Sequence, residues 1–344
     1  MSGTILVATA GQGVMKSADN GQSWHRLSLG QDIEFDAVTR SLDMDPANPA
    51  TVYIGTDTGL CVSRDAGANW KHIDTPFNGE TVWKVAVDPN NSRRIFVGTG
   101  APSRAALWST TDSGTSWSRV NPDIPEHCAG VSKPRLLAFA YDPTDSNRLW
   151  FGLEEGGLFK STDAGVHWER IDSRLLWDFN SDIHSIRVLT NYGKKTIVVV
   201  CVNAVYRSYD EGETWEGMNP NEEYGLYYAR ATAVPAGSED TIYLSISDGT
   251  PGSTSRVLVS HDAAASWEIL PLPVNPNSCV WAIHVNPGNT GDVVAGTKYG
   301  HLFTSEKSGL SWKKEWREFS EITDVLWTPA TAEIKAAHQS ILKS

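Results

Sequence analysis

The sequence predicts an all-β protein, a seven-bladed β-propeller, and three observations lead to this prediction. A box with the pattern Ser/Thr-x-Asp-x-Gly-x-x-Trp recurs along the chain. Successive boxes lie 48 residues apart on average, so a chain of 344 residues holds seven units and leaves no room for a second domain. Each unit consists of short β-rich segments separated by Gly, Pro, Asn and Asp turns, without a long helical repeat. A period near 50 residues with four short strands in each unit is typical of propeller blades.

The boxes account for half of the 14 tryptophans. The sixth box has Ala264 in place of glycine, and the seventh has Lys307 in place of aspartate. We expect a structural role, in which the carboxylate accepts hydrogen bonds from its own hairpin, the glycine permits a positive φ and the tryptophan packs between blades. The aspartates given this role are Asp19, Asp65, Asp112, Asp163, Asp210 and Asp262.

The strands of one blade are predicted in order from the segments around each box. The first, inner strand ends in an Asp-Pro or Asn-Pro turn, as at Asp45-Pro46 and Asp88-Pro89. The second strand is β-rich, as in 52–56 and 95–99, and the third precedes the box, as in 157–161. The fourth strand follows the tryptophan. Turn residues at each of these junctions favour tight reversals of the chain.

The two ends of the chain predict how the ring closes. Residues 4–9 match a second strand, so the first blade lacks an inner strand of its own. Residues 322–328 resemble an inner strand with nothing after them to complete a blade. We therefore expect this C-terminal strand to join the N-terminal blade, because closure removes exposed sheet edges. The predicted propeller spans 1–329, and 330–344 form a tail.

Composition excludes several classes of protein. The chain has 29 basic and 41 acidic residues, a formal charge of −12, which argues against nucleic acid as a partner. Apolar runs such as 197–202 are too short to span a membrane, and the N-terminus has no signal-peptide pattern. Four isolated cysteines favour a reducing compartment, so we expect a cytoplasmic protein. Phosphate-loop, dinucleotide and zinc motifs are missing, and no cofactor is predicted.

The boxes, together with the segments 139–143 and 160–168, resemble those of the BNR/Asp-box propellers. The two segments look most like the photosystem II assembly factor and the xyloglucan-processing glycoside hydrolases. The chain lacks the Arg-Ile-Pro segment of sialidases. The resemblance implies the propeller fold, while proteins that share this box perform unrelated functions.

A propeller has a channel along its central axis, lined by the inner strands. We expect the loops of irregular length to lie at the end of this channel where the inner strands begin, and such loops commonly carry function. The first residues of these strands, with the loop residue Lys298, would project into this opening. Converging cations there would favour an anionic ligand, and the aromatic rings could stack on a sugar. Alternatively, the cations pair with Asp36, Asp182 and Asp324 around a water-filled channel. The predicted ligand-binding residues are Arg40, Trp83, Lys84, Arg135, Tyr228, Arg230 and Trp281.

Candidate catalytic groups come from the same opening. Aspartates from different blades could reach the separation of about 5–9.5 Å between the carboxyl groups of glycosidases, and a histidine could act as a base. His184 and His284 are also the candidates for a metal site. We expect Glu154 and Glu155 to cap a turn. The candidate catalytic residues are Asp36, Asp182, His184 and Asp324.

Two functional hypotheses follow. In the first, the propeller recognises a polar, anionic small molecule or a protein partner at this opening without catalysis. In the second, it is an intracellular hydrolase or lyase that uses an aspartate or histidine at the same place. The sequence leaves the oligomeric state open.

Overall fold

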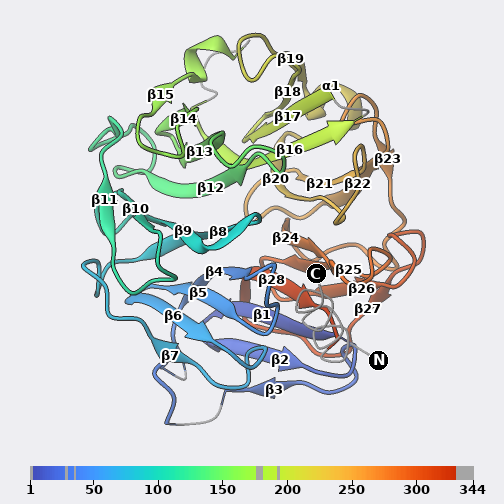
Figure 1. The fold of residues 1–344 in the computed structure, drawn as a ribbon. Coiled ribbons are helices and arrows are strands. Elements are labelled where there is room, and N and C mark those ends of the chain that lie inside the picture. Colours follow the sequence, from blue (N-terminus) through green and yellow to red (C-terminus); the bar gives the residue numbers. More distant parts are fainter. Residues whose placement is uncertain (1–2, 28–29, 35, 176–180, 192–193, 331–344) are drawn as a thin grey trace, which may run out of the picture.

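Short antiparallel strands make up nearly all of the regular structure. The computed structural model describes residues 3–27, 30–34, 36–175, 181–191 and 194–330, and within them 28 strands form seven four-stranded sheets around a central axis (Figure 1). The prediction of an all-β, seven-bladed propeller is confirmed. Each sheet pairs its strands in chain order from the axis outwards, except that the first blade takes its inner strand from the C-terminal end.

The two strands of each blade nearest the axis are its inner and second strands. The inner strands are β28 (Glu321–Thr328), β4 (Thr39–Met44), β8 (Val82–Asp88), β12 (Arg135–Tyr141), β16 (Ile183–Asn191), β20 (Tyr228–Ala233) and β24 (Val280–Val285). The second strands are β1 (Thr4–Ala10), β5 (Val52–Thr56), β9 (Asn91–Thr99), β13 (Leu149–Glu154), β17 (Lys194–Cys201), β21 (Ile242–Ser247) and β25 (Val293–Thr297).

The outer half of each blade is shorter. The third strands are β2 (Val14–Ser17), β6 (Gly59–Ser63), β10 (Leu107–Thr110), β14 (Gly157–Ser161), β18 (Ala204–Ser208), β22 (Ser255–Ser260) and β26 (Leu302–Ser305). The outer strands are β3 (His25–Arg26), β7 (Lys71–His72), β11 (Ser118–Val120), β15 (Glu169–Arg170), β19 (Glu216–Met218), β23 (Glu268–Ile269) and β27 (Lys313–Lys314). Two short helices, η1 (Asp172–Arg174) and α1 (Pro220–Tyr224), lie in loops that lead to inner strands.

The ring closes as the sequence predicted. Strand β28 pairs with β1 from Thr4 opposite Thr328 to Ala10 opposite Glu321, so both ends of the chain share one sheet. Ile322, Leu326 and Trp327 of β28 are at most 1% exposed. Burial of these side chains fixes the closing strand in place, since each apolar side chain of this size contributes roughly 1.5–3 kcal/mol when buried.

Apolar contacts between neighbouring blades form the core. One cluster joins Trp150 of β13 to Ile186 of β16 and Tyr206 of β18, and six similar clusters are found among the described residues. Glycine in several second strands allows this close packing. A Cβ atom on Gly296 would lie 2.8 Å from Cγ2 of Ile322 in the next inner strand, and Gly55, Gly98 and Gly152 stand equally close to the next blade.

The boxes form the turns between third and outer strands. In the first box, the Asp19 carboxylate accepts the backbone N–H of Ser23 at 2.9 Å and the hydroxyls of Ser17 and Ser23 at 2.8 and 2.6 Å. These hydrogen bonds, that from the Ser23 hydroxyl foremost, lower the pKa of Asp19 to about 2. The indole N–H of Trp24 donates to the carbonyl of Gly21 at 3.1 Å. The aspartate and the tryptophan of this box therefore form hydrogen bonds within their own turn, as the structural role predicts.

Two further sequence predictions concern the ends of the chain and membranes. The predicted tail, 330–344, lies outside the described residues from 331 onwards. Among the residues that the structure describes, none of the helices is long and apolar enough to cross a membrane.

Candidate functional site

An extra residue in every inner strand creates the candidate site. Against its second strand, each of six inner strands has one residue without a pairing partner near its beginning, and β20 has two such residues opposite Ser245. Such a β-bulge turns a side chain away from the regular alternation. The residues at these bulges are Arg40, Trp83, Leu137, His184, Arg230 with Ala231, Trp281 and Thr323.

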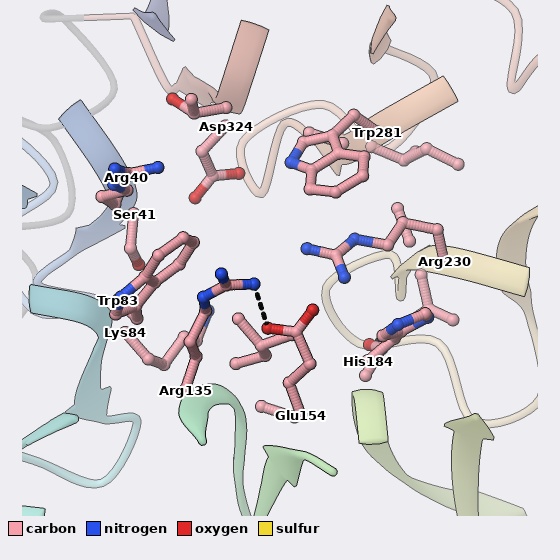
Figure 2. Close-up of a pocket in the computed structure, with 18 of the residues that line it drawn as sticks. Arg40, Ser41, Trp83, Lys84, Arg135, Glu154, His184, Arg230, Trp281 and Asp324 are labelled. Atoms are coloured by element: carbon pink, nitrogen blue, oxygen red, sulfur yellow. Dashed lines mark hydrogen bonds and ion pairs between the residues drawn. The ribbon is translucent and has the colours of Figure 1, made fainter. Parts of the chain in front are cut away.

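All of these bulge residues line one cavity of about 320 Å³, which we call the mouth. Figure 2 shows Arg40 and Trp83 on one side of it and Arg230 and Trp281 on the other. The structure thus brings together most of the residues predicted for the site. Those that line the mouth are Arg40, Trp83, Lys84, Arg135, His184, Arg230, Trp281 and Asp324, with the loop residue Lys298.

Each of the two tryptophans carries two cations. The guanidinium carbons of Arg40 and Arg135 lie 4.2 and 4.9 Å from the ring centre of Trp83. The Trp83 indole N–H also donates to the carbonyl of Ala101 at 2.8 Å, which fixes the ring. The indole ring of Trp83 therefore contacts two cations of the chain itself. The sequence had predicted that this ring stacks on a ring of the ligand. Cation–π contact of this kind contributes about 0.5–2 kcal/mol.

The second tryptophan repeats this arrangement. The Arg230 guanidinium carbon lies 3.8 Å, and the Lys298 Nζ 4.3 Å, from the ring centre of Trp281. A stacked guanidinium presents its N–H edge sideways, and this edge is the part that matches a carboxylate or phosphate. The indoles therefore orient the cations that face the cavity.

Two glutamates neutralise one cation on each side. Arg135 Nη1 lies 2.6 Å from Glu154 Oε2, and Lys298 Nζ lies 2.6 Å from Glu321 Oε1. The prediction that Glu154 caps a turn is therefore wrong, because it lies directly across the β12–β13 ladder from Arg135 and faces the mouth. Its neighbour Glu155 does bind a loop, by accepting the backbone N–H of Val131 at 3.1 Å.

The other two arginines that contact the tryptophans have no such partner. Among the residues that the structure describes, Arg40 and Arg230 have no carboxylate oxygen within 4 Å. The Arg40 Nε is buried without a hydrogen-bond partner there, and burial lowers the pKa of this guanidinium. An arginine nevertheless stays charged at neutral pH. Among the described residues no ion pair within 4 Å joins the predicted cations to Asp36, Asp182 or Asp324, although the charges of Arg230 and Arg135 favour the ionised form of Asp182 and that of Lys84 favours the ionised form of Asp324.

The floor of the mouth is also charged. Arg187 and Lys84 reach it together with Asp324. Arg187 donates to the carbonyl of Thr232 at 2.8 Å. The Asp324 carboxylate accepts the backbone N–H groups of Leu42 and Val325 at 2.8 and 2.9 Å, so it bridges two blades. Burial raises its pKa despite the nearby Lys84.

His184 is held by acceptors on both ring nitrogens. Its Nδ1 lies 2.6 Å from the carbonyl oxygen of Ala229 and must donate, and its Nε2 lies 3.3 Å from Asp182 Oδ1. The backbone carbonyl of Ala229 and the neighbouring carboxylate of Asp182 therefore hold the imidazole ring in place. Although burial opposes it, the contact with His184 lowers the pKa of Asp182.

Four predicted residues lie elsewhere. Asp36 is exposed in the loop before β4, and neither it nor Asp182 lines the mouth. Tyr228 is 6% exposed and its ring centre packs 5.2 Å from that of His184, behind the cavity wall. His284 lines a second cavity of about 420 Å³ at the opposite end of the channel, where its Nδ1 accepts the Trp327 backbone N–H at 3.1 Å.

The described residues contain no group of three His, Cys, Asp or Glu side chains that could hold a metal ion. Sequence reasoning missed Glu321 and Arg187, and it misjudged Glu154. The hairpin register that places Glu154 opposite Arg135 could have identified that pair. Arg187 lies in the middle of an inner strand, and nothing in its local sequence marks it.

Comparison with known proteins agrees with this fold. The family model described as Sortilin-Vps10 (sortilin, neurotensin receptor 3) matches residues 58–175. A xyloglucanase of Hypocrea jecorina is 25% identical over 366 residues, which cover 91% of this chain and 43% of the xyloglucanase. The photosystem II assembly lipoprotein Ycf48 of Synechococcus sp. (strain CC9902) is 24% identical over 246 residues, covering 67% and 66% of the two chains. The chain thus spans less than half the length of the xyloglucanase.

Solved structures show the same architecture. The GH74 enzyme of Niastella koreensis has a TM-score of 0.61 at 15% identity and covers 96% of this chain and 70% of its own. Ycf48 bound to D1 peptide has a TM-score of 0.54 at 15% identity, with 81% of each chain covered. At 15% sequence identity, the similarity to these solved structures shows a shared fold and nothing about function. The repeated strands, the family model and these relatives together support a β-propeller of the BNR type.

Proposed function

We propose that this propeller is a recognition module that binds an anionic group in the mouth, without catalysis. The observation that carries the proposal is the charge of the cavity lining. Six cationic side chains face three carboxylates there, although the whole chain carries a formal charge of −12. Cations gathered in a concave site concentrate the field on a bound anion.

The orientation of the cations supports the same proposal. Arg40 and Arg230 are held on indole rings by contacts of 4.2 and 3.8 Å, and no carboxylate oxygen of the described residues lies within 4 Å of either guanidinium group. Because both guanidinium groups are already held in position, their side chains lose little conformational entropy when a ligand binds. The cation-covered indoles also favour an anion over a neutral sugar, which would need a free ring face.

The ligand has two possible sources. A cavity of about 320 Å³ fits a small molecule or a terminal group of a larger one. Ycf48 in complex with D1 peptide shows that a propeller of similar fold binds a peptide partner. We therefore include a protein partner that offers an acidic group at the mouth, along with free small anions.

Isothermal titration calorimetry with sulfate, phosphate, citrate, glucuronate and glucose tests the proposal. We expect anions to bind and glucose to give no heat. Arg40→Ala and Arg230→Ala should each weaken anion binding, whereas Arg64→Ala should not, because Arg64 is exposed in a box turn away from the mouth. Equal binding by all three variants would contradict the proposal, as would an absence of binding to any anion.

The second candidate function is hydrolysis of a glycoside, and one observation favours it. Asp324, a carboxyl group whose pKa is raised by burial, shares the mouth with Glu154, as an acid and a second carboxylate would in a glycosidase. Release of reducing ends from xyloglucan oligosaccharides by the wild type, and its loss in Asp324→Asn, would support this function. No release at high enzyme concentration would leave recognition as the function.

The cytoplasmic location stays a prediction. It rests on the four cysteines, which form no disulfide in the described part of the chain, and three of which are buried.

A further inference from the structure

The mouth contains two matched half-sites. In the first, Trp83 carries Arg40 and Arg135, and Glu154 pairs with Arg135. In the second, Trp281 carries Arg230 and Lys298, and Glu321 pairs with Lys298. Each half-site therefore consists of one indole, one cation paired with a glutamate, and one arginine without a carboxylate partner among the described residues.

The stacked arginine and the tryptophan of the two half-sites occupy equivalent positions of the ring. In each, an arginine at the bulge of one inner strand stacks on a tryptophan at the bulge of the next: Arg40 of β4 on Trp83 of β8, and Arg230 of β20 on Trp281 of β24. The paired glutamate comes from the blade that follows the tryptophan. Figure 2 shows that the two arginines enter the cavity from opposite sides.

This duplication bears on the charge of the ligand. Each half-site has two cations and one glutamate, and so a surplus of one positive charge. Lys84, Arg187 and Asp324 belong to the floor and to neither half-site. A ligand with a single acidic group can neutralise the surplus charge of only one half-site. A ligand with an acidic group at each end neutralises both, and the second contact forms at a high effective concentration.

We propose that the mouth is selective for a dianion with two separated acidic groups, of the dicarboxylate class, held by Arg40 at one end and Arg230 at the other. This inference rests on the proposed recognition function and specifies its ligand. Carboxylates suit the guanidinium edges, because both are planar and form two parallel hydrogen bonds. Between the two ends, the hydroxyl side chains of Thr232, Thr323 and Ser185 line the wall and suit a polar, uncharged middle part.

Calorimetry at fixed ionic strength with two series of ligands tests the selectivity. The dianions are succinate, glutarate, adipate and pimelate, and the monoanions are propionate, butyrate and valerate. We expect one dianion length to bind about tenfold or more tightly than any monoanion, since both ends then act together. Dianions that bind no more than twofold better than monoanions would overturn the inference, while binding of the monoanions would still support the proposed function. Failure of every anion to bind would overturn both.

A double-mutant cycle with Arg40→Ala and Arg230→Ala gives an independent test. For the best dianion, either single substitution should reduce the affinity to the level of a monoanion, and the double variant should not bind. For butyrate, each single substitution should cost about twofold, because one of two equivalent half-sites remains. Equal losses for both ligand classes would overturn the inference.

The cycle needs a control for folding. Arg40→Lys and Arg230→Lys keep the charge but lose the planar fork, so they should reproduce a large part of the loss for the dianion. Thermal unfolding without ligand identifies any alanine variant that fails to fold, and the lysine variants then supply the comparison. Lysine variants that bind the dianion like the wild type would show that the forks do not select it.

Discussion

At the scale of single residues, the two mouth tryptophans act as supports for cations. Sequence reasoning placed Trp83 and Trp281 correctly at the opening but expected them to touch the ligand through their rings. The structure places two cations within 5 Å of each ring centre. An aromatic residue among converging arginines is therefore used here to orient charge.

This role predicts how substitutions of Trp281 act. Trp281→Ala should weaken binding of glutarate roughly 3- to 30-fold, because Arg230 and Lys298 lose a contact worth about 0.5–2 kcal/mol. Trp281→Phe should retain part of the affinity, since a phenyl ring still attracts cations. Calorimetry of the three proteins measures the difference, and an unchanged affinity in Trp281→Ala would refute the supporting role.

The buried carboxyl group of Asp43, which lines the second cavity together with His284, predicts a dependence of stability on pH. Burial raises the pKa of Asp43 from 3.8 to about 6. Between these two values the folded protein keeps a proton that the unfolded chain has lost, so the free energy of unfolding falls as the pH rises. Asp43→Asn cannot ionise. Its free energy of unfolding, relative to the wild type, should therefore rise by about 2 kcal/mol from pH 4 to pH 7.

Urea unfolding of Asp43→Asn and the wild type at pH 4, 5, 6 and 7 checks this expectation. The substitution also removes an acceptor for the backbone N–H of Val87 or Met44, which the carboxylate binds at 2.8 and 3.0 Å. That loss is the same at every pH and leaves the slope unchanged. A constant difference across the series would show that Asp43 ionises normally in the folded protein.

At the scale of strands, the sequence predicted more of the fold than of the site. Boxes and turns are local signals, so the blades and their order could be predicted from spacing. Residues at the starts of inner strands, such as Arg40 and Arg230, were also found. A bulge leaves no signature in a single sequence, because it depends on the register with the neighbouring strand. For the same reason Glu154, an ion-pair partner across a ladder, was mistaken for a turn residue.

Packing between blades predicts that glycine in second strands is required. Gly296→Ala should lower the free energy of unfolding by about 1–3 kcal/mol, because the added methyl group would collide with Ile322 of the next inner strand. Ile322→Ala alone should cost about 2–5 kcal/mol. The double variant should lose less than the sum of the two, since the space left by Ile322 accepts the methyl group. Urea unfolding measures all three, and additive losses would contradict the packing explanation.

At the scale of the whole molecule, one strand completes the ring. A variant that ends at Ser320 lacks β28, which leaves β1 without its inner partner and uncovers apolar side chains of the first blade. We expect it to aggregate or to lack a cooperative unfolding transition, because an unpaired edge beside an apolar face promotes association. A variant that ends at Ala330 keeps the strand and should unfold cooperatively. Size-exclusion chromatography and thermal unfolding compare them, and a stable monomer ending at Ser320 would contradict this account of closure.

The seven bulges have a consequence for how new specificities arise. Each bulge residue is surplus to the ladder of its blade, so its side chain can be exchanged without shifting the register of any strand. Stability is encoded mainly in the boxes and the faces between blades, whereas the bulge residues contribute much of the chemistry of the opening. The same ring can therefore be redirected to a different ligand by substitutions that leave its architecture intact.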